Sequence, residues 1–344
     1  MRSIFLIFGI LQACYAKDLR KDRWEITDFI WDAGLIALSD KGSEPSPIQF
    51  FEHEYSLFFD PEPYKNIQSG DIVWLKCRFV APFCDQILPK TKHPFVLIIN
   101  DGDESFPSQC GLVTKRLEDF LLDDRVIHIF AQNCDLQEKH AKITLLPIGL
   151  DFHTIAYKGQ GGWGEIGSPL EQEAQLKKIL QTFAPTHLRK TGAFVDFQFS
   201  DSIRSGEQKR YLQFGEDRTT IFHRLLPTGL INHGKWMRRS ELWKTKGKYA
   251  FSISPHGNGL DCHRTWEDLT LGCIVIVKTS SLDPLYEGLP VVIVQDWSEI
   301  TLENMEQWKQ LYKDAFTNPS YREKLTHRYW MEKIQAKAQP YKNM

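Results

Sequence analysis

The sequence predicts an α/β protein with two domains. Its 344 residues exceed the length of one ordinary domain, and an apolar content of 42% is enough for one or two substantial cores. Short β-rich runs alternate with helical or turn-rich segments in both halves of the chain, which is the pattern of parallel α/β units. We therefore expect a first domain over residues 17–184, a second over 185–301, and a helical C-terminal segment over 302–344.

The first domain is expected to contain a parallel sheet. Its β-rich runs cover residues 71–80, 95–100, 126–131 and 143–150. Each run ends in polar residues, such as those that follow the second run. Because ligands of open α/β sheets bind beyond the carboxyl ends of the strands, these strand ends are candidate binding positions.

The second domain follows a glycine-rich segment at 159–164, which predicts a loop near the domain boundary. A linker is expected at 184–186. The tail over 302–338 is charged, with aromatic and apolar residues at roughly helical spacing, so it is expected to be helical. Strands are expected at 193–199, 249–253, 274–277 and 291–294, and helices at 170–183, 219–226, 239–244 and 262–271.

The N-terminal segment 1–16 has the pattern of a secretory signal peptide. Arg2 precedes an apolar run over residues 4–11, and small residues end at Ala16. The run is well below the roughly 20 residues needed to span a bilayer, which disfavours a membrane anchor. A buried first strand is the alternative interpretation of the same run.

Charge and cysteine content exclude some classes of protein. The 42 basic and 44 acidic side chains leave a net charge of −2, without the basic footprint of a nucleic-acid-binding protein. The cysteines after the signal segment show no C-x-x-C spacing, so no structural zinc site is predicted. Their even number permits disulfides in an exported chain; they are Cys77, Cys84, Cys110, Cys134, Cys262 and Cys273.

The densest functional signal is the stretch over residues 249–269. An expected strand enters a glycine-containing loop, and the loop feeds a helix whose N-terminus points back at the end of the strand. The free N–H groups and partial positive charge of such a helix start suit a diphosphate. Gly257 and Gly259 carry no side chain and let the backbone approach a ligand closely.

Arg264 and Glu267 are three residues apart and lie on one face of the expected helix, so both can reach the same ligand. Arginine offers a fixed fork of donors for phosphate oxygens, and the glutamate can accept both hydroxyls of a ribose. A solvated surface salt bridge is the alternative for this pair. Asp261 is expected to cap the helix, where its carboxylate would repel a diphosphate unless His263 and Arg264 offset the charge.

The opposite face of the same helix is apolar. Trp266 and Leu269 lie on it, and Cys273 follows shortly after the helix. We expect these three side chains to belong to the core, and we assign them no function.

The stretch resembles the donor-binding motif of exostosin-like glycosyltransferases. In these families a strand ending in Ser-Pro-x-Gly leads into a helix with Arg-x-x-Glu, followed by a Leu-x-x-Gly-Cys-Ile-Pro-x-Val strand. This chain has Ser-Pro-His-Gly at 254–257, Arg-Thr-Trp-Glu at 264–267 and Leu-Gly-Cys-Ile-Val-Ile-Val at 271–277. Val275 stands where proline is usual, which removes no ligand group. The resemblance is clearest over residues 249–298.

The resemblance implies the GT-B architecture, in which two Rossmann-like domains face a cleft and a C-terminal helix packs back on the first domain. A nucleotide-sugar donor would bind the second domain, and a glycan or another hydroxyl acceptor would lie against the first. No cofactor, tightly bound metal ion or nucleic acid is implied, and the oligomeric state is open. The implied donor-binding residues are Ser254, His256, Gly257, Asn258, Gly259, His263, Arg264 and Glu267, with Arg218 reaching across the cleft.

Within this set, Glu267 would bind the ribose, while Arg264 and the 257–259 loop would hold the diphosphate. A salt bridge is the alternative role for Arg218, and a loop-filling side chain is the alternative for His256. A chain with a cleaved signal peptide and this activity would work in the lumen of the endoplasmic reticulum or Golgi, to which nucleotide sugars must be delivered.

An inverting transfer also needs a general base near the acceptor hydroxyl. Asp151 and His153 follow the strand expected at 143–150 and are the candidate catalytic residues. A turn aspartate and a surface histidine are the alternative. Asp101 and Asp103 form a second acidic turn after another strand. A retaining mechanism needs no such base, and the sequence leaves both mechanisms open.

Two other classes of function fit parts of the pattern. A catalytically inactive protein that binds carbohydrate or nucleotide would keep Arg264 and Glu267 but lack a working base. A nucleotide-dependent dehydrogenase is disfavoured, because the chain lacks G-x-G-x-x-G and the ribose-binding acid that follows it after about 20 residues.

Overall fold

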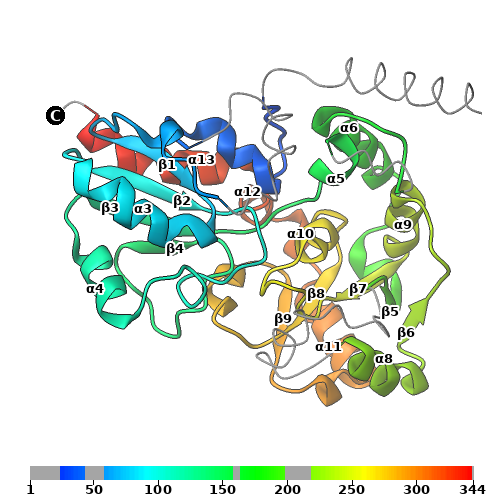
Figure 1. The fold of residues 1–344 in the computed structure, drawn as a ribbon. Coiled ribbons are helices and arrows are strands. Elements are labelled where there is room, and N and C mark those ends of the chain that lie inside the picture. Colours follow the sequence, from blue (N-terminus) through cyan, green and yellow to red (C-terminus); the bar gives the residue numbers. More distant parts are fainter. Residues whose placement is uncertain (1–23, 43–57, 158–162, 198–217, 343–344) are drawn as a thin grey trace, which may run out of the picture.

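The computed structural model describes residues 24–42, 58–157, 163–197 and 218–342. The predicted signal peptide, Cys14 and most of the glycine-rich segment lie outside these residues. The described chain forms two parallel sheets, one in each half of the sequence (Figure 1). Among the described helices, none is long and apolar enough to cross a membrane.

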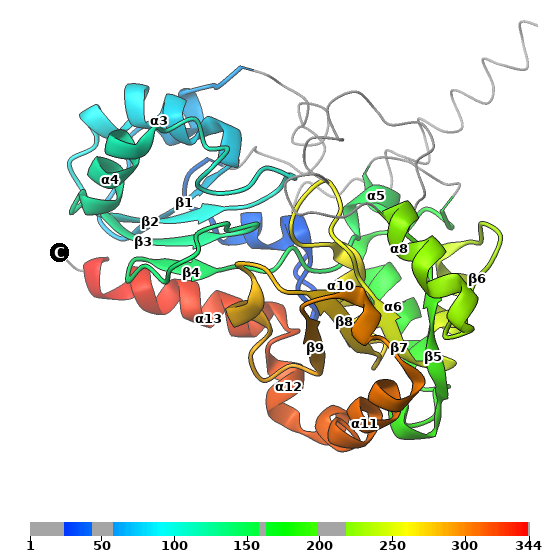
Figure 2. The same ribbon diagram turned by 90° about the horizontal axis from the view of Figure 1, so that it is seen from below.

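The first sheet has four parallel strands in the order β1-β2-β3-β4. Every residue of the central strand β2 is buried, as expected of a strand covered on both faces. Helices α3 and α4 lie on one side of this sheet (Figure 2). The bounds are β1 (Asp71–Leu75), β2 (Phe95–Ile99), β3 (Val126–Ala131), β4 (Ile143–Leu145), α3 (Val80–Gln86) and α4 (Thr114–Leu122).

Two strands of this domain are shorter than the sequence predicts. The chain leaves the sheet after Leu75 and turns into helix, so the strand predicted over 71–80 is wrong beyond residue 75. The strand predicted over 143–150 ends at Leu145. Beyond it the chain runs beside residues 30–32, where Trp31 and Leu150 form a parallel bridge. An apolar run of this kind looks the same in sequence whether it pairs in the sheet or packs beside it.

The second sheet has five parallel strands in the order β6-β5-β7-β8-β9. The strands predicted at 249–253, 274–277 and 291–294 are confirmed, and β8 is one residue longer than expected. The short edge strand β6 is an addition to the prediction. The bounds are β5 (Lys190–Val195), β6 (Ile231–His233), β7 (Tyr249–Ile253), β8 (Ile274–Lys278) and β9 (Val291–Val294).

Helices follow the strands of both domains close to the predicted positions. The helix predicted over 170–183 begins with Pro169 after a Ser168 capping box, which satisfies two free N–H groups at its start. The α-helices are α5 (His153–Ala156), α6 (Pro169–Leu180), α8 (Arg218–Leu225), α9 (Arg239–Lys246) and α10 (His263–Thr270). The 3-10 helices are η1 (Asp32–Leu38), η2 (Glu62–Tyr64), η3 (Cys77–Phe79), η4 (Leu88–Lys90), η5 (Thr186–Leu188), η6 (Leu226–Thr228), η7 (Asp283–Tyr286), η8 (Trp297–Glu299), η9 (Ala315–Thr317) and η10 (Gln339–Tyr341).

The C-terminal segment crosses back to the first domain, as the predicted architecture requires. It is divided into α11 (Leu302–Leu311), α12 (Pro319–Glu323) and α13 (His327–Ala338). Helix α13 packs against β1, β2 and β3, on the side of the sheet away from α3 and α4 (Figure 2). The Nε2 atom of His327 lies 3.0 Å from the carbonyl oxygen of Gly34, which ties the helix to η1.

One buried apolar cluster runs through both domains. It includes Trp31 and Phe152 from the first domain and Trp266 and Leu269 from α10, each 0% exposed. Trp266, Leu269 and Cys273 are therefore core residues, as predicted. Because the cluster is continuous, burial of α10 and the packing of the two domains stabilise each other.

None of the six described cysteines forms a disulfide, so the pairing that the sequence permits does not occur among them. Most are buried as free thiols in the apolar cores. Burial raises the pKa of Cys134 to about 11 and that of Cys273 to about 12, which keeps both thiols protonated.

We expect Trp266→Ala to lower the free energy of unfolding by about 3–5 kcal/mol, because it opens a large cavity in the shared core. Urea titration followed by circular dichroism measures the loss. Trp236→Ala is the matched control, since that side chain is 67% exposed and its removal should change stability by less than about 0.5 kcal/mol. Equal losses in the two variants would contradict the assignment of Trp266 to the core.

Candidate functional site

The candidate site lies where the carboxyl ends of both sheets meet. The loops after β3 and β4 are joined there to the loop after β7 by hydrogen bonds between the domains. The N–H group of Ile148 donates to Asp261 Oδ2 at 2.8 Å, and the N–H group of Asp261 donates to Asn133 Oδ1 at 2.8 Å. His263 Nδ1 lies 2.9 Å from the carbonyl oxygen of Gly149. The two loops therefore form one surface instead of facing each other across open solvent.

Asp261 does not cap helix α10, and the predicted capping role is wrong. The helix begins at His263, Cys262 occupies the N-cap position, and no side chain caps it. Asp261 Oδ2 instead accepts from Ile148 and from Trp266 Nε1, the latter at 2.7 Å, while Oδ1 accepts the N–H group of Cys262 at 2.9 Å. Burial raises the pKa of Asp261 to about 6, although these N–H donors favour its charged form. Asp261 therefore links the two domains through buried hydrogen bonds.

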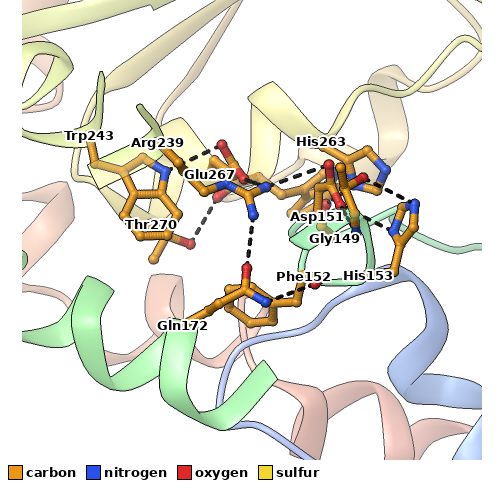
Figure 3. A network of polar contacts seen from close by, with 12 residues as sticks. Gly149, Asp151, Phe152, His153, Gln172, Arg239, Trp243, His263, Glu267 and Thr270 are labelled. Atoms are coloured by element: carbon orange, nitrogen blue, oxygen red, sulfur yellow. Dashed lines mark hydrogen bonds and ion pairs between the residues drawn. The ribbon is translucent and has the colours of Figure 1, made fainter. Parts of the chain in front are cut away.

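Glu267 is held by Arg239 of helix α9. Their side chains form an ion pair at 2.8 Å, and Arg239 also donates to Gln172 of α6 at 2.9 Å (Figure 3). The guanidinium group lies 3.5 Å from Asp151 and packs over the ring of Trp243. Arg239 is only 3% exposed, so this is a buried network joining α6, α9, α10 and the loop after β4.

Arg264 faces a different partner. Its Nε donates to Asp196, the residue after β5, at 2.7 Å. Lys246 pairs with the same carboxylate at 2.9 Å and with Asp268 at 2.8 Å. Although burial raises the pKa of Asp196, Lys246 and Arg264 outweigh it and hold that pKa well below its usual range. Arg264 and Glu267 therefore do not point to a common position, contrary to the prediction. Neither side chain forms a solvated surface salt bridge.

One nitrogen of Arg264 is left available. Among the described residues, its buried Nη1 atom has no hydrogen-bond partner. The guanidinium therefore retains a donor after Asp196 has taken its Nε. A phosphate oxygen is the kind of acceptor that such a donor suits.

The glycine loop is closely packed on both sides. A side chain at Gly257 would meet Arg218 Nη2 at 2.8 Å, and one at Gly259 would meet Asn133 Nδ2 at 2.7 Å. A side chain at either position would thus displace one of these two side chains, and the predicted close approach to a ligand stays a prediction. Arg218 reaches the loop from its own domain: its Nε donates to the carbonyl oxygen of His256 at 3.0 Å. The predicted contact of Arg218 with a diphosphate stays a prediction.

The other predicted donor-side residues border the same loop. Ser254 Oγ lies 2.9 Å from Thr265 Oγ1 at the start of the loop. His256 Nδ1 lies 2.9 Å from the carbonyl oxygen of Leu260, which braces the loop internally. Asn258 is half-buried at the far end of the loop. The sequence motif therefore folds into one compact strand, loop and helix unit.

Asp151 and His153 lie together at the first-domain side of the site. His153 Nδ1 is 3.2 Å from Asp151 Oδ1 and also contacts Asp32 Oδ2 of η1. His153 is 7% exposed, so the alternative of a surface histidine is wrong. Burial raises the pKa of Asp151, but His153, Arg239 and His263 outweigh it and keep the pKa well below its usual range.

Asp101 and Asp103 lie outside this network. Asp101 is buried and pairs with Lys76 at 2.9 Å, and Asp103 is exposed. A cavity of about 810 Å³ lies on another side of the domain junction, between residues 134–145 and the segment around η7. Its lining shares no residue with the polar network of Figure 3.

Three residues of the site were missed from sequence. Asp32 contacts His153, Arg239 contacts Glu267 and Asp196 contacts Arg264, and none of these pairs is close in the sequence. None of the three stands in a recognisable motif. Only the folded chain brings them to the site. 

Comparisons with known proteins give only distant similarities to solved structures. No family model matches the sequence, and no curated protein matches it significantly. Similar solved structures include a UDP-forming α,α-trehalose-phosphate synthase from Burkholderia xenovorans, with 9% identity, 89% of this chain and 84% of that chain covered, and a TM-score of 0.34. A sucrose-phosphate synthase from Thermosynechococcus elongatus has 10% identity, 93% and 83% coverage, and a TM-score of 0.34. An E. coli trehalose-6-phosphate structure bound with UDP-2-fluoro glucose has 12% identity, 79% and 72% coverage, and a TM-score of 0.32.

The class of fold follows from the chain's own architecture. Two parallel-sheet α/β domains meet at the carboxyl ends of their strands, and a C-terminal helix returns to the first domain (Figures 1 and 2). This is the arrangement predicted for the GT-B architecture. At these identities and TM-scores the likeness carries no argument about activity or substrate.

We expect Asp196→Asn to destabilise the protein by about 3 kcal/mol at pH 7, because Lys246 and Arg264 lose a buried counter-charge. The folded-state pKa of Asp196 is lowered, so its contribution is fully present above the unfolded value of about 3.9. This contribution to stability is lost as the pH falls from there toward the lower pKa of the folded state. The difference between parent and variant should therefore shrink between pH 5 and about pH 3, measured by urea titration across this range.

Asp119→Asn is the control for this measurement, since Asp119 is exposed and pairs only weakly with Lys115 at 3.9 Å. Its effect should stay near zero at every pH. A constant difference for Asp196→Asn down to pH 3 would contradict a lowered pKa in the folded state.

Proposed function

We propose that this chain is a glycosyltransferase that moves a sugar from a nucleotide-sugar donor to a hydroxyl group of a glycan or another acceptor. One observation carries the proposal. The exostosin-like motif folds as a strand, a glycine loop and a helix at the carboxyl edge of the second sheet, opposite polar residues of the first domain. In open α/β sheets this edge is where ligands bind.

The donor is proposed to bind along the start of helix α10. Gly257 and Gly259 carry no side chain that would keep a diphosphate from the backbone, and the N-terminus of the helix favours its negative charge. Arg264 Nη1 is the donor group left for a phosphate oxygen among the described contacts. Glu267 is proposed to accept the ribose hydroxyl groups while Arg239 holds its carboxylate in place.

The acceptor side is proposed to use His153 as general base in an inverting transfer. Its Nδ1 atom contacts Asp32 and Asp151, two carboxylates that stabilise the imidazolium formed when the ring takes a proton. The acceptor oxygen attacks the anomeric carbon, the bond to the diphosphate breaks, and the acceptor proton passes to His153. The charge on the leaving diphosphate is met by Arg264 and by the loop N–H groups.

We also propose the compartment in which the protein acts. The N-terminal segment, which lies outside the described residues, is proposed to direct the chain into the secretory pathway. Sugar transfer would then take place in a compartment to which the nucleotide-sugar donor has been delivered.

Arg264→Ala and Glu267→Ala are each expected to weaken nucleotide-sugar binding by about 1–3 kcal/mol, the loss of a charged hydrogen bond. Isothermal titration calorimetry with a panel of nucleoside diphosphate sugars measures this and identifies the preferred donor. Glu241→Ala, an exposed change on helix α9, is the control and should leave affinity unchanged. If folded Arg264 and Glu267 variants bind as tightly as the parent, the donor site lies elsewhere.

His153→Gln is expected to lower kcat about 10²–10⁴-fold while leaving donor affinity unchanged, because only proton transfer is removed. Initial rates of sugar transfer and calorimetry on the same samples separate the two quantities. Unchanged kcat would remove His153 from the mechanism and favour a retaining reaction. Donor binding without any transfer or donor hydrolysis in the parent chain would instead identify a catalytically inactive binding protein.

A further inference from the structure

Three metal-ligating side chains converge where the two domains meet. Asp32 comes from η1, His153 from α5, and His263 from the first residue of α10. One ligand atom from each lies within 4.8 Å of the other two. The two imidazole rings are 5.8 Å apart between centroids and lie side by side in Figure 3. The cluster thus draws one ligand from the second domain and two from the first.

The hydrogen bond of His263 decides which of its nitrogens can bind a cation. Its Nδ1 atom lies 2.9 Å from the carbonyl oxygen of Gly149, which can only accept, so Nδ1 carries the proton. In the neutral ring, Nε2 then presents a lone pair, 3.9 Å from Asp32 Oδ2. A lone pair beside a carboxylate oxygen is repelled unless a positive charge lies between them. A carbonyl bond to the far nitrogen is also how metal-binding histidines are commonly oriented.

The carboxylate of Asp32 is buried and only partly hydrogen-bonded. Asp32 is 3% exposed, and its Oδ1 atom is buried with no hydrogen-bond partner among the described residues. Its other oxygen contacts His153 Nδ1. Leaving a carboxylate oxygen buried and unpaired is costly, and a metal ion would satisfy it. The contact between Asp32 and His153 leaves this second oxygen without a partner.

We propose that Asp32, His153 and His263 bind one divalent transition-metal ion of the zinc type. Two imidazoles and a carboxylate are ligands that Zn²⁺ accepts, at about 2.0–2.2 Å from the metal. Ligand atoms around such an ion lie about 3.5 Å apart, so movements of about 1 Å would gather these three. The side chain of His263 is 27% exposed, which leaves a side open for a water molecule as fourth ligand.

The proposed site goes beyond sugar transfer and has a consequence for it. Because the ligands come from both domains, a bound ion would hold the domain junction closed. It would also occupy the ring of His153, which the proposed transferase mechanism uses as a base. Metal binding is therefore expected to inhibit transfer, and the ion is not required for the reaction.

Titration of the full chain with Co²⁺, after treatment with a chelator, tests the site without any sugar substrate. Co²⁺ in a four-coordinate nitrogen and oxygen site gives intense visible absorption, and Zn²⁺ added later should displace it. We expect one ion per chain. His263→Ala and Asp32→Asn should each weaken binding at least about tenfold. His187→Ala, which changes an exposed histidine outside the cluster, is the matched control and should bind like the parent.

Circular dichroism spectra establish that each variant is folded, and His263→Ala decides the result if Asp32→Asn fails to fold. Absence of visible absorption in the parent, or equal Co²⁺ affinity in the parent and folded His263→Ala, would overturn the site. A transfer assay with and without Zn²⁺ then tests the link to His153. Because Co²⁺ binding is measured without donor or acceptor, failure of the proposed transferase activity would leave the metal result intact, and the reverse also holds.

Discussion

The buried guanidinium group of Arg239 is the interaction on which the arrangement of the two domains depends. It pairs with Glu267 of α10 at 2.8 Å, lies 3.5 Å from Asp151 in the loop after β4, and donates to Gln172 of α6. A buried charge is tolerated only while its partners stay in place. Because those partners come from both sides of the domain junction, one side chain fixes helix α10 against the first domain.

Helix α10 is held on its other side by a second network. Arg264 pairs with Asp196, and Lys246 joins Asp196 to Asp268 beneath the helix. Arg264 and Glu267 therefore belong to separate networks. The network of Glu267 faces the first domain, and that of Arg264 lies inside the second domain. The helix start and the glycine loop lie at the junction, where we propose that the N–H groups and the buried Arg264 Nη1 meet the anionic donor. Rigid support of this kind positions a binding site.

The sequence predicted the second domain well because its signals are local. Apolar runs such as 249–253 and 291–294 pair as expected, and helix α10 follows the glycine loop to within one residue. Strand β6 was missed because three residues carry too little periodicity. The site was only half predictable: the motif located Arg264 and Glu267, but their partners Asp196 and Arg239 reach them through the fold and leave no pattern in the chain.

The Asp261 prediction failed for a related reason. An aspartate one residue before a helix start has two uses for its carboxylate: the free N–H groups of its own helix, or donors elsewhere in the protein. Sequence shows only the first. In the folded chain the Ile148 N–H group and Trp266 Nε1 both donate to Oδ2, while Oδ1 accepts the N–H group of Cys262 just before the helix. The carboxylate therefore stays at the start of α10 but also bonds to the first domain, which sequence does not reveal.

The proposed transfer and the proposed metal site both use the imidazole ring of His153 at the domain junction. His153 contacts Asp32 and Asp151, and His263 stands beside it with a lone pair directed toward Asp32. Two carboxylates and two imidazoles in a buried space favour a positive charge at their centre, which a proton or a metal ion can supply. A proton can move on to a product, whereas a metal ion held by three ligands stays. Transfer and metal loading are thus alternative states of one cluster, and the free metal concentration sets the balance between them.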